Sequence, residues 1–411
     1  MRLWLALLLA LAAGAVTAAQ AGAEPGLRKA LSMGSINHGG DFEDLNYHGN
    51  LDMVRQTGAR WVRMWVRWDK AQLFAPSRLS WSRLDSSAND LPGCGSGCGV
   101  GYIRSMDQQI AAARAAGLNV VLVTWHFPRW ANGTEGRPAD WAREDRGSAT
   151  TPVERLKPME YRVPTGQLGR NGYYGRWIDW LIGRYSRYGR RVALEVMNEP
   201  NHQLWPQQGP STSGDPYGPG TVVIDDYVAE MMETARQVSA ARGNPLMVVG
   251  PGLSDRFGAD SRLMTNFQTA VPETLSRLAE RGFKSASNFV WSHHNYSDVE
   301  RNIQSPNTRA EQARAYLVGR WRGLGGTSDP KLWLTEGGAR LGQSQATDLT
   351  KQAELVRLNW DRMTAAPGIQ MWSNYLLYGD PTANSGLREA RSSGGAARPV
   401  WNVFASFPAN L

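Results

Sequence analysis

The sequence predicts one α/β domain, a (β/α)8 TIM barrel of eight parallel strands surrounded by helices. Short apolar runs rich in β-forming residues alternate with longer helical segments along the chain after residue 22. Neither a low-complexity linker nor a fixed-period repeat divides these segments. The composition, 42% hydrophobic and 20% charged, is typical of a globular protein with a sizeable core. A strand count of eight is the number that closes such a barrel.

The expected strands follow one another at the spacing of βαβ units. In chain order they are Leu31–Asn37, Arg60–Trp68, Asn119–His126, Val192–Glu199, Leu246–Pro251, Asn288–Tyr296, Leu332–Glu336 and Ile369–Tyr375. The expected helices between them are Asp44–Thr57, Ser105–Ala116, Tyr174–Tyr188, Asp225–Arg242, Met264–Arg281, Thr308–Arg322 and Asp348–Ala366. Several of these helices end at a glycine, as left-handed C-caps require.

Two connections in this pattern are unusually long. Residues 127–172 follow the third strand and residues 200–221 follow the fourth, and both are rich in Pro and Gly. Both leave the carboxyl ends of strands, where barrel enzymes build their sites. We therefore expect these long loops after strands 3 and 4 to shape a substrate cleft.

The N-terminus has the pattern of a secretory signal peptide. Arg2 is followed by an apolar run to Val16, and Ala19-Gln20-Ala21 offers a small-x-small cleavage site. We expect residues 1–21 to be removed on export and residues 22–411 to form a single catalytic domain. A retained N-terminal anchor is the alternative. The mature protein is then secreted, extracellular or periplasmic, without a membrane span.

The two cysteines, Cys94 and Cys98, lie in one glycine-rich run. A short disulfide is favoured over two free thiols in an oxidising compartment. A metal site would need further ligands nearby in the sequence, so we expect no metal and no cofactor.

The formal charge is +8, but the arginines are scattered rather than clustered. A nucleic-acid partner is therefore not indicated. The charge is compatible with attraction to an anionic cell surface or polysaccharide, but a compositional bias toward Arg is favoured. The chain also carries 17 Trp. Trp stacks on sugar rings and equally fills cores, so this count favours a carbohydrate substrate without establishing it. We expect a monomer.

Two predicted strands end in a glutamate. The fourth runs into Asn198-Glu199-Pro200, and the seventh into Thr335-Glu336-Gly337. A carboxyl group at the end of a buried strand costs free energy unless it is paired or hydrogen-bonded, so its presence there needs an explanation. Cleavage of a glycosidic bond supplies one, because it needs one carboxyl to protonate the leaving oxygen and another to attack the anomeric carbon or activate water.

With these motifs the chain resembles the large clan of retaining glycosidases that includes glycoside hydrolase families 5 and 39. In that clan an Asn-Glu pair ends strand four and a second Glu ends strand seven, which are the strands counted above. The resemblance implies a retaining mechanism with Glu199 as acid/base and Glu336 as nucleophile. Glu199 should then have a raised pKa, and Glu336 should stay ionised.

The resemblance also implies a set of substrate-binding residues. Arg63 and Tyr296 are expected to bond the nucleophile. Asn198 is expected to bond the sugar 2-hydroxyl, and Trp372 to form the base of the sugar site. Two histidines complete the set: His294 opens the His-x-Tyr pattern of strand six, and His126 ends strand three beside a loop similar to those of clan members.

Some positions keep two interpretations. Glu195 lies on the same strand face as Glu199, where an internal ion pair is favoured over a catalytic role. Arg63 is equally compatible with serving Glu336 and with pairing with Glu195. Because adjacent strand residues point to opposite faces, only one of His293 and His294 is expected at the site.

The leading hypothesis is a secreted retaining glycoside hydrolase that acts on a poly- or oligosaccharide. A transglycosylase, or an arabinofuranose- or xylose-specific relative, would use the same carboxylates. From another class, a non-catalytic carbohydrate-binding barrel would keep the carboxylates as binding groups. The sequence does not distinguish endo from exo action.

Overall fold

The computed structural model describes residues 26–35, 44–47, 49–93, 95–128, 130–131, 169–200, 224–254, 267–302, 304–342, 345–379 and 384–409. The predicted signal peptide, Cys94, and most of the long loops after the third and fourth strands lie outside these residues.

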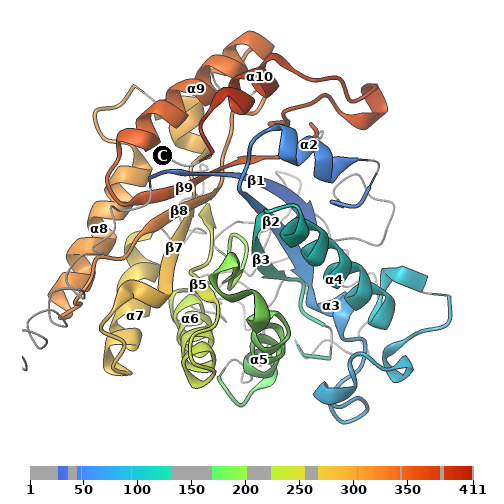
Figure 1. The fold of residues 1–411 in the computed structure, drawn as a ribbon. Coiled ribbons are helices and arrows are strands. Elements are labelled where there is room, and N and C mark those ends of the chain that lie inside the picture. Colours follow the sequence, from blue (N-terminus) through green and yellow to red (C-terminus); the bar gives the residue numbers. More distant parts are fainter. Residues whose placement is uncertain are drawn as a thin grey trace, which may run out of the picture.

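The described strands form one parallel sheet that closes into a barrel (Figure 1). The strands are β1 (Arg28–Ser35), β2 (Trp61–Arg67), β3 (Asn119–Trp125), β4 (Val192–Glu195), β5 (Met247–Val249), β6 (Leu253–Ser254), β7 (Phe289–His294), β8 (Leu332–Glu336) and β9 (Ile369–Tyr375). Their order is β5-β4-β3-β2-β1-β9-β8-β7-β6, and pairing of β5 with β7 closes the ring. The short β6 pairs only with the end of β7, so eight strands make the barrel. The predicted (β/α)8 fold is confirmed.

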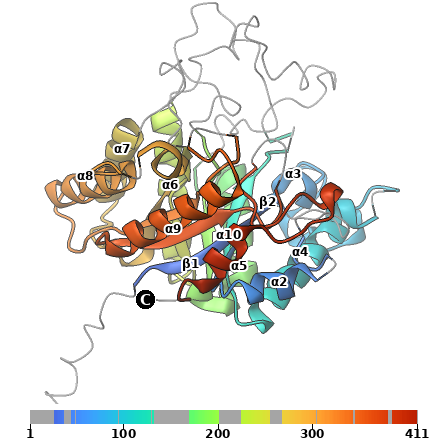
Figure 2. The same cartoon turned by 90° about the horizontal axis from the view of Figure 1, so that it is seen from above.

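Helices surround the barrel on the outside (Figure 1). They are α2 (Asn50–Gln56), α3 (Trp68–Ala71), α4 (Gly99–Ala115), α5 (Tyr173–Tyr185), α6 (Ile224–Ala241), α7 (Phe267–Glu280), α8 (Arg309–Gly323), α9 (Leu349–Ala365) and α10 (Pro399–Ser406). The short α3 and the C-terminal α10 are absent from the predicted set. α10 lies against α9 in both views (Figures 1 and 2). Buried Lys29 on β1 donates to the carbonyls of Phe404 and Phe407 at the end of α10, both at 2.8 Å.

Strand alternation divides the buried side chains into two cores. Apolar residues on the outer face of the strands pack against the helices and form the large core. Inward-pointing residues fill the barrel, with Trp61 and Trp333 in edge-to-face contact at the amino ends of β2 and β8. The barrel is therefore a packed core whose carboxyl end is left for polar groups.

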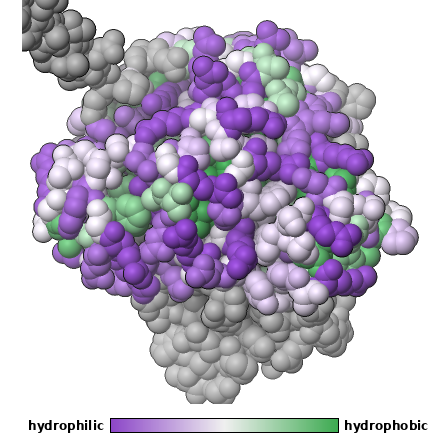
Figure 3. Space-filling view, turned by 60° about the horizontal axis from the view of Figure 1, so that its bottom comes forward, coloured by the Kyte–Doolittle hydropathy of each residue, from purple (hydrophilic) through white to green (hydrophobic). Residues whose placement is uncertain are grey.

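The surface carries few large apolar side chains. Leu91 is the one large hydrophobic residue of the described chain that is exposed. The face seen in Figure 3 is mainly hydrophilic, with small separate apolar patches. In the described part of the chain, every helix is too short or too polar to cross a membrane.

The structure describes one of the two cysteines in the predicted disulfide. Cys98, at the start of α4, is disulfide-bonded. Its expected partner, Cys94, lies outside the described residues.

Candidate active site

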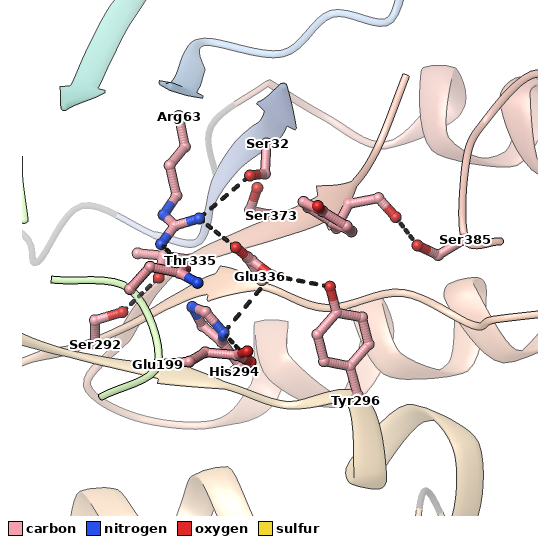
Figure 4. Close-up of polar contacts among 12 residues, drawn as sticks. Ser32, Arg63, Glu199, Ser292, His294, Tyr296, Thr335, Glu336, Ser373 and Ser385 are labelled. Atoms are coloured by element: carbon pink, nitrogen blue, oxygen red, sulfur yellow. Dashed lines mark hydrogen bonds and ion pairs between the residues drawn. The ribbon is translucent and has the colours of Figure 1, made fainter. Parts of the chain in front are cut away.

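A cluster of buried polar side chains lies at the carboxyl ends of the strands (Figure 4). It draws residues from five strands or the turns after them: Ser32, Arg63, Glu195, Asn198, Glu199, Ser292, His294, Tyr296, Thr335 and Glu336. Because the strands are parallel, their carboxyl ends meet at one end of the barrel, and residues distant in sequence become neighbours there.

Arg63 on β2 is the cationic centre of the cluster and is 1% exposed. Its Nε donates to Glu195 at 2.7 Å, and its Nη2 donates to Glu195 at 2.9 Å and to the Asn198 side-chain oxygen at 2.8 Å. Its Nη1 donates to Glu336. Arg63 therefore pairs with both carboxylates at once, and the two interpretations of this residue are combined rather than exclusive.

A β-bulge directs Glu336 into the barrel. On β8, Leu334 is in register with His293 and Glu336 with His294, so Thr335 is an extra residue on this strand. A bulge lets two consecutive side chains face the same side. Thr335 accordingly bonds Glu195 at 3.3 Å, while Glu336 contacts Arg63 and accepts from the Tyr296 hydroxyl at 3.0 Å.

Glu199 sits just beyond β4 with a left-handed backbone, φ 41°. This conformation is unfavourable for a side chain other than Gly and costs about 1–3 kcal/mol, so the surrounding structure must hold it. The Glu199 amide donates to the Gly252 carbonyl at 2.8 Å. The strained backbone turns the Glu199 carboxyl toward His294, which lies 2.8 Å away through Nδ1.

His294 lies between the two proposed catalytic carboxyls. Its Nδ1 is 2.8 Å from Glu199 and 3.6 Å from Glu336. In the contact with Glu199, Nδ1 donates when Glu199 is ionised and accepts when Glu199 carries the proton and the ring is neutral. One ligand atom from each of these three side chains lies within 4.8 Å of the others, a spacing that a divalent cation could also bridge.

Burial and opposing charges set the protonation of the site. Burial raises the pKa of Glu336, with the charges of Glu199 and Glu195 adding, while His294 and Arg63 oppose the rise. Burial alone would lower the pKa of His294, but Glu336 and Glu199 outweigh it and raise this pKa.

Burial and the Glu336 charge raise the pKa of Tyr296 well above its ordinary value, so its hydroxyl remains a donor.

The predicted site residue His126 is buried beside Trp125. His126 follows β3 with φ 49°, and its ring packs edge-on against Trp125 at 3.9 Å between centroids. Burial lowers the pKa of His126 well below its ordinary value, helped by Arg67 and Lys70, so it is neutral.

The prediction that Trp372 floors the sugar site is wrong. Its side chain is fully buried between the sheet and the outer helices, against Trp360, Phe404 and Phe407. Strand alternation explains this, because Trp372 is in register with the outward-facing Leu334.

Tyr375, at the end of β9, occupies the inward position that the sequence analysis missed. Its ring stacks on Trp65 at 6.1 Å and meets Tyr296 edge-on at 6.4 Å. Trp65 in turn meets Trp125 edge-on at 4.5 Å. These rings form one aromatic cluster that contacts Tyr296, the donor to Glu336. Met371 on β9 faces the inside of the barrel. Because side chains alternate along a strand, Tyr375, four residues later, faces the same way, and this pattern identifies it in the sequence.

His293 and the Asn-x-Ser glycosylation sequon Asn295-Tyr296-Ser297 have structural roles. The His293 side chain is buried, and burial lowers its pKa to about 3. Asn295, which begins the sequon, is fully buried and donates to Asn359 at 3.2 Å. A glycan cannot be attached to it in the folded protein.

Replacing Glu195 by Gln tests how far this carboxylate controls the site. Losing one partner of a buried ion pair should cost about 3–5 kcal/mol of stability, measured by urea unfolding. The charge of Glu195 is among the causes that raise the pKa of Glu336, so its removal should lower that pKa. The acidic limb of the pH profile of kcat/KM should therefore move to lower pH.

A matched control is Glu233→Gln, which removes a carboxylate paired with Arg281 on the outer helices. It should leave the pH profile unchanged. An acidic limb that stays in place or moves upward in Glu195→Gln would contradict the role assigned to Glu195.

Comparisons with known proteins agree with this fold. The model of the family described as Cellulase (glycosyl hydrolase family 5) matches residues 26–365. The fold is similar to the structure of wild-type ZgEngAGH5_4, with a TM-score of 0.52 and 12% identity over 92% of this chain and 95% of that one. It is also similar to a family 39 glycoside hydrolase from the gut symbiont Bacteroides cellulosilyticus WH2, with a TM-score of 0.51 and 14% identity over 93% of this chain and 63% of that one.

A search of curated proteins finds no match. The family model covers well over half of the chain. The chain belongs to the cellulase family, glycosyl hydrolase family 5, and is an O-glycosyl hydrolase.

Proposed function

We propose that this protein is a secreted retaining β-glycosidase in which Glu336 is the nucleophile and Glu199 the acid/base. The observation that carries the proposal is the close approach of these two carboxyls, with oxygen atoms within 4.8 Å of each other. Retaining glycosidases hold their carboxyls about 5–5.5 Å apart, whereas inverting ones need about 6.5–9.5 Å to admit a water molecule.

The surroundings of the two carboxyls support different roles. Glu336 contacts Arg63 and the Tyr296 hydroxyl, both of which stabilise a carboxylate. Glu199 is the more exposed of the pair, with 13% of its side chain accessible against 5% for Glu336. An acid/base group must exchange protons with the leaving group and then with water, and the greater access of Glu199 suits that task.

The reaction proceeds in two displacements. In the first, a Glu336 oxygen attacks the anomeric carbon while the Glu199 proton passes to the departing glycosidic oxygen. In the second, Glu199 takes a proton from water, whose oxygen attacks the same carbon and releases Glu336. The Asn198 side-chain oxygen is engaged by Arg63, which leaves its amide N–H groups as donors toward the sugar 2-hydroxyl.

We infer a β-linked glucan as the substrate class. The family description names cellulases. The aromatic cluster of Trp65, Trp125 and Tyr375 contacts Tyr296, the donor to Glu336, and aromatic rings stack on the apolar faces of pyranose rings.

Export and a single catalytic domain over residues 22–411 remain part of the proposal. They rest on the apolar run and the Ala19-Gln20-Ala21 site. N-terminal sequencing of the protein collected outside the cytoplasm should begin at residue 22. A retained residue 1 would contradict the signal peptide.

Digestion of a panel of β-glucans, xylans and mannans tests the function. Proton NMR of the first sugar released should show the β-anomer before mutarotation. Initial release of the α-anomer would refute the retaining mechanism. Longer products built from two substrate molecules would instead favour the transglycosylase.

The pH profile of kcat/KM should reflect the raised pKa of the buried nucleophile, Glu336. Burial raises the pKa of Glu336, so this group takes up its proton at a pH above the ordinary range of a glutamate. As pH falls through that raised pKa, the nucleophile is lost and kcat/KM should decline. Measured from pH 3 to 9, the acidic limb should lie above about pH 4.3, the ordinary glutamate value. An acidic limb below it would contradict the burial argument.

A further inference from the structure

A second buried ion pair lies next to the carboxylate cluster and has no part in the mechanism above. Arg340 and Glu300 are 6% and 1% exposed. The Arg340 Nε donates to one Glu300 oxygen at 2.5 Å and Nη2 to the other at 2.6 Å. This bidentate arrangement fixes the plane of the guanidinium as well as its position.

The pair joins the two segments that carry Tyr296 and Glu336. Glu300 follows Tyr296 by four residues, in the π-helical turn Asp298–Asn302. Arg340 follows Glu336 by four residues, beyond a turn in which Gly338 has φ 120°. A Cβ at Gly338 would lie 2.8 Å from the Asn374 side-chain oxygen, so glycine is needed for this turn. One segment begins at Tyr296 and the other at Glu336, and the Arg340–Glu300 ion pair joins them.

The Arg340 guanidinium lies over the ring of Tyr296. Its Cζ is 4.7 Å from the ring centroid. The hydroxyl of the same ring donates to Glu336 at 3.0 Å. A cation on an aromatic face attracts the π electrons of the ring. Electron withdrawal from a phenol makes its O–H a stronger donor, and a stronger donor stabilises the carboxylate that accepts from it.

Stability alone is a weak reason for such a pair. Replacing a buried ion pair by apolar residues is often neutral or stabilising, because two charges must be desolvated. The pair instead places a fixed cation where its field reaches the hydrogen-bond donor of the nucleophile.

We propose that Arg340, held by Glu300, is a positioning residue that acts on Glu336 through Tyr296. It orients the phenol ring and strengthens the Tyr296 hydrogen bond to the nucleophile. The inference rests on the proposed function, in which Glu336 attacks the sugar. Glu336 also faces Arg63 from β2, Glu195 and Glu199 from β4 and the turn after it, and His294 from β7.

The test is a double-mutant cycle on an aryl β-cellobioside. One arm replaces the pair by Arg340→Gln with Glu300→Gln, which avoids a lone buried charge. The other arm is Tyr296→Phe, which removes the hydroxyl and keeps the ring. In the wild-type background, the neutral pair should lower kcat by at least about threefold and move the acidic limb of kcat/KM to higher pH. In the Tyr296→Phe background, the same change should alter kcat by less than about twofold and leave the limb in place.

The control changes a pair of the same geometry on the outer helices. Arg362 donates through Nε and Nη2 to the two oxygens of Glu311, at 3.1 and 2.6 Å. Arg362→Gln with Glu311→Gln should lower Tm without moving the pH profile. A neutral Arg340–Glu300 pair that behaves in the same way would overturn the proposal.

Arg340→Lys keeps a positive charge near the Tyr296 ring. It is the variant to measure if the enzyme with Arg340→Gln and Glu300→Gln folds poorly. Its acidic limb should stay close to that of the wild type. A limb displaced to higher pH in a folded Arg340→Lys enzyme would contradict the role of the charge.

The outcomes separate this coupling from the proposed function. Turnover of the glycoside by the unaltered enzyme tests the function. If Tyr296→Phe lowers kcat, and the neutral Arg340–Glu300 pair lowers it by the same further factor as in the wild type, the coupling between the pair and Tyr296 is overturned but the proposed function is not. An unimpaired Tyr296→Phe enzyme overturns both the coupling and the support that Tyr296 gives to Glu336 in the proposed mechanism.

Discussion

Glu336→Gln should abolish glycoside hydrolysis while the protein stays folded. The amide keeps the shape of the carboxyl and can still accept from Tyr296, but it cannot form the glycosyl-enzyme bond. Loss of a nucleophile lowers kcat by several orders of magnitude in enzymes where it has been removed, so we expect a fall of at least about 10,000-fold. The measurement is the initial rate on an aryl β-cellobioside, with circular dichroism to check the fold.

The control for this variant is Glu273→Gln, which neutralises a carboxylate on the surface of α7. Its rate should match the wild type. A Glu336→Gln enzyme with more than a few per cent of wild-type activity would remove Glu336 from the nucleophile role.

Glu199→Ala should lose activity in a way that depends on the leaving group. A general acid contributes about 100- to 10,000-fold, and most of this is needed when the leaving oxygen is poorly stabilised. The variant should be nearly inactive on cello-oligosaccharides and much less impaired on dinitrophenyl glycosides, which depart without a proton. The Brønsted dependence of kcat/KM on the leaving-group pKa is the measurement.

Azide provides the second arm of the Glu199 test. The cavity left by the side chain admits a small anion that needs no general base to attack the glycosyl-enzyme. Added azide should restore turnover of the dinitrophenyl substrate and yield a β-glycosyl azide. A variant that azide does not rescue, and that loses the same factor on every substrate, would point to another acid.

The barrel could be predicted from the sequence because its signals are local. Each of the eight barrel strands is an apolar run that ends where a loop begins, and β8 (Leu332–Glu336) and β9 (Ile369–Tyr375) have the predicted bounds. The fourth expected strand, Val192–Glu199, is four residues too long, because β4 ends at Glu195 and the backbone then turns through the left-handed conformation of Glu199. Helix α10 (Pro399–Ser406) was missed because it follows the last barrel strand, where the alternation of strand and helix requires no further helix.

The site is predictable where residue type and strand end coincide. The two glutamates follow from strand ends, and the resemblance to the glycosidase clan adds Asn198, His294 and Tyr296. The structure places these residues together around Arg63. Trp372 was misplaced because a resemblance fixes a strand but not the face to which a side chain points. One residue of register decides between the sugar site and the outer core.

Other features depend on contacts between distant segments. The bulge that turns Glu336 inward appears only in the register of β7 against β8. The three-way bonding of Arg63 to Glu195, Asn198 and Glu336 joins residues up to 273 positions apart. The Arg340–Glu300 pair likewise arises from two turns that meet above the strands. Such geometry is a property of packing and has no local signature.

Covalent trapping tests the central claim most directly. A 2-deoxy-2-fluoro β-cellobioside with a dinitrophenyl leaving group slows release of the glycosyl-enzyme, so the intermediate should accumulate. Mass spectrometry of the intact protein should show the addition of one fluoroglycosyl group, and peptide mapping should locate it on Glu336. A label on another carboxylate, or turnover without any labelled protein and with inversion at the anomeric carbon, would contradict the account.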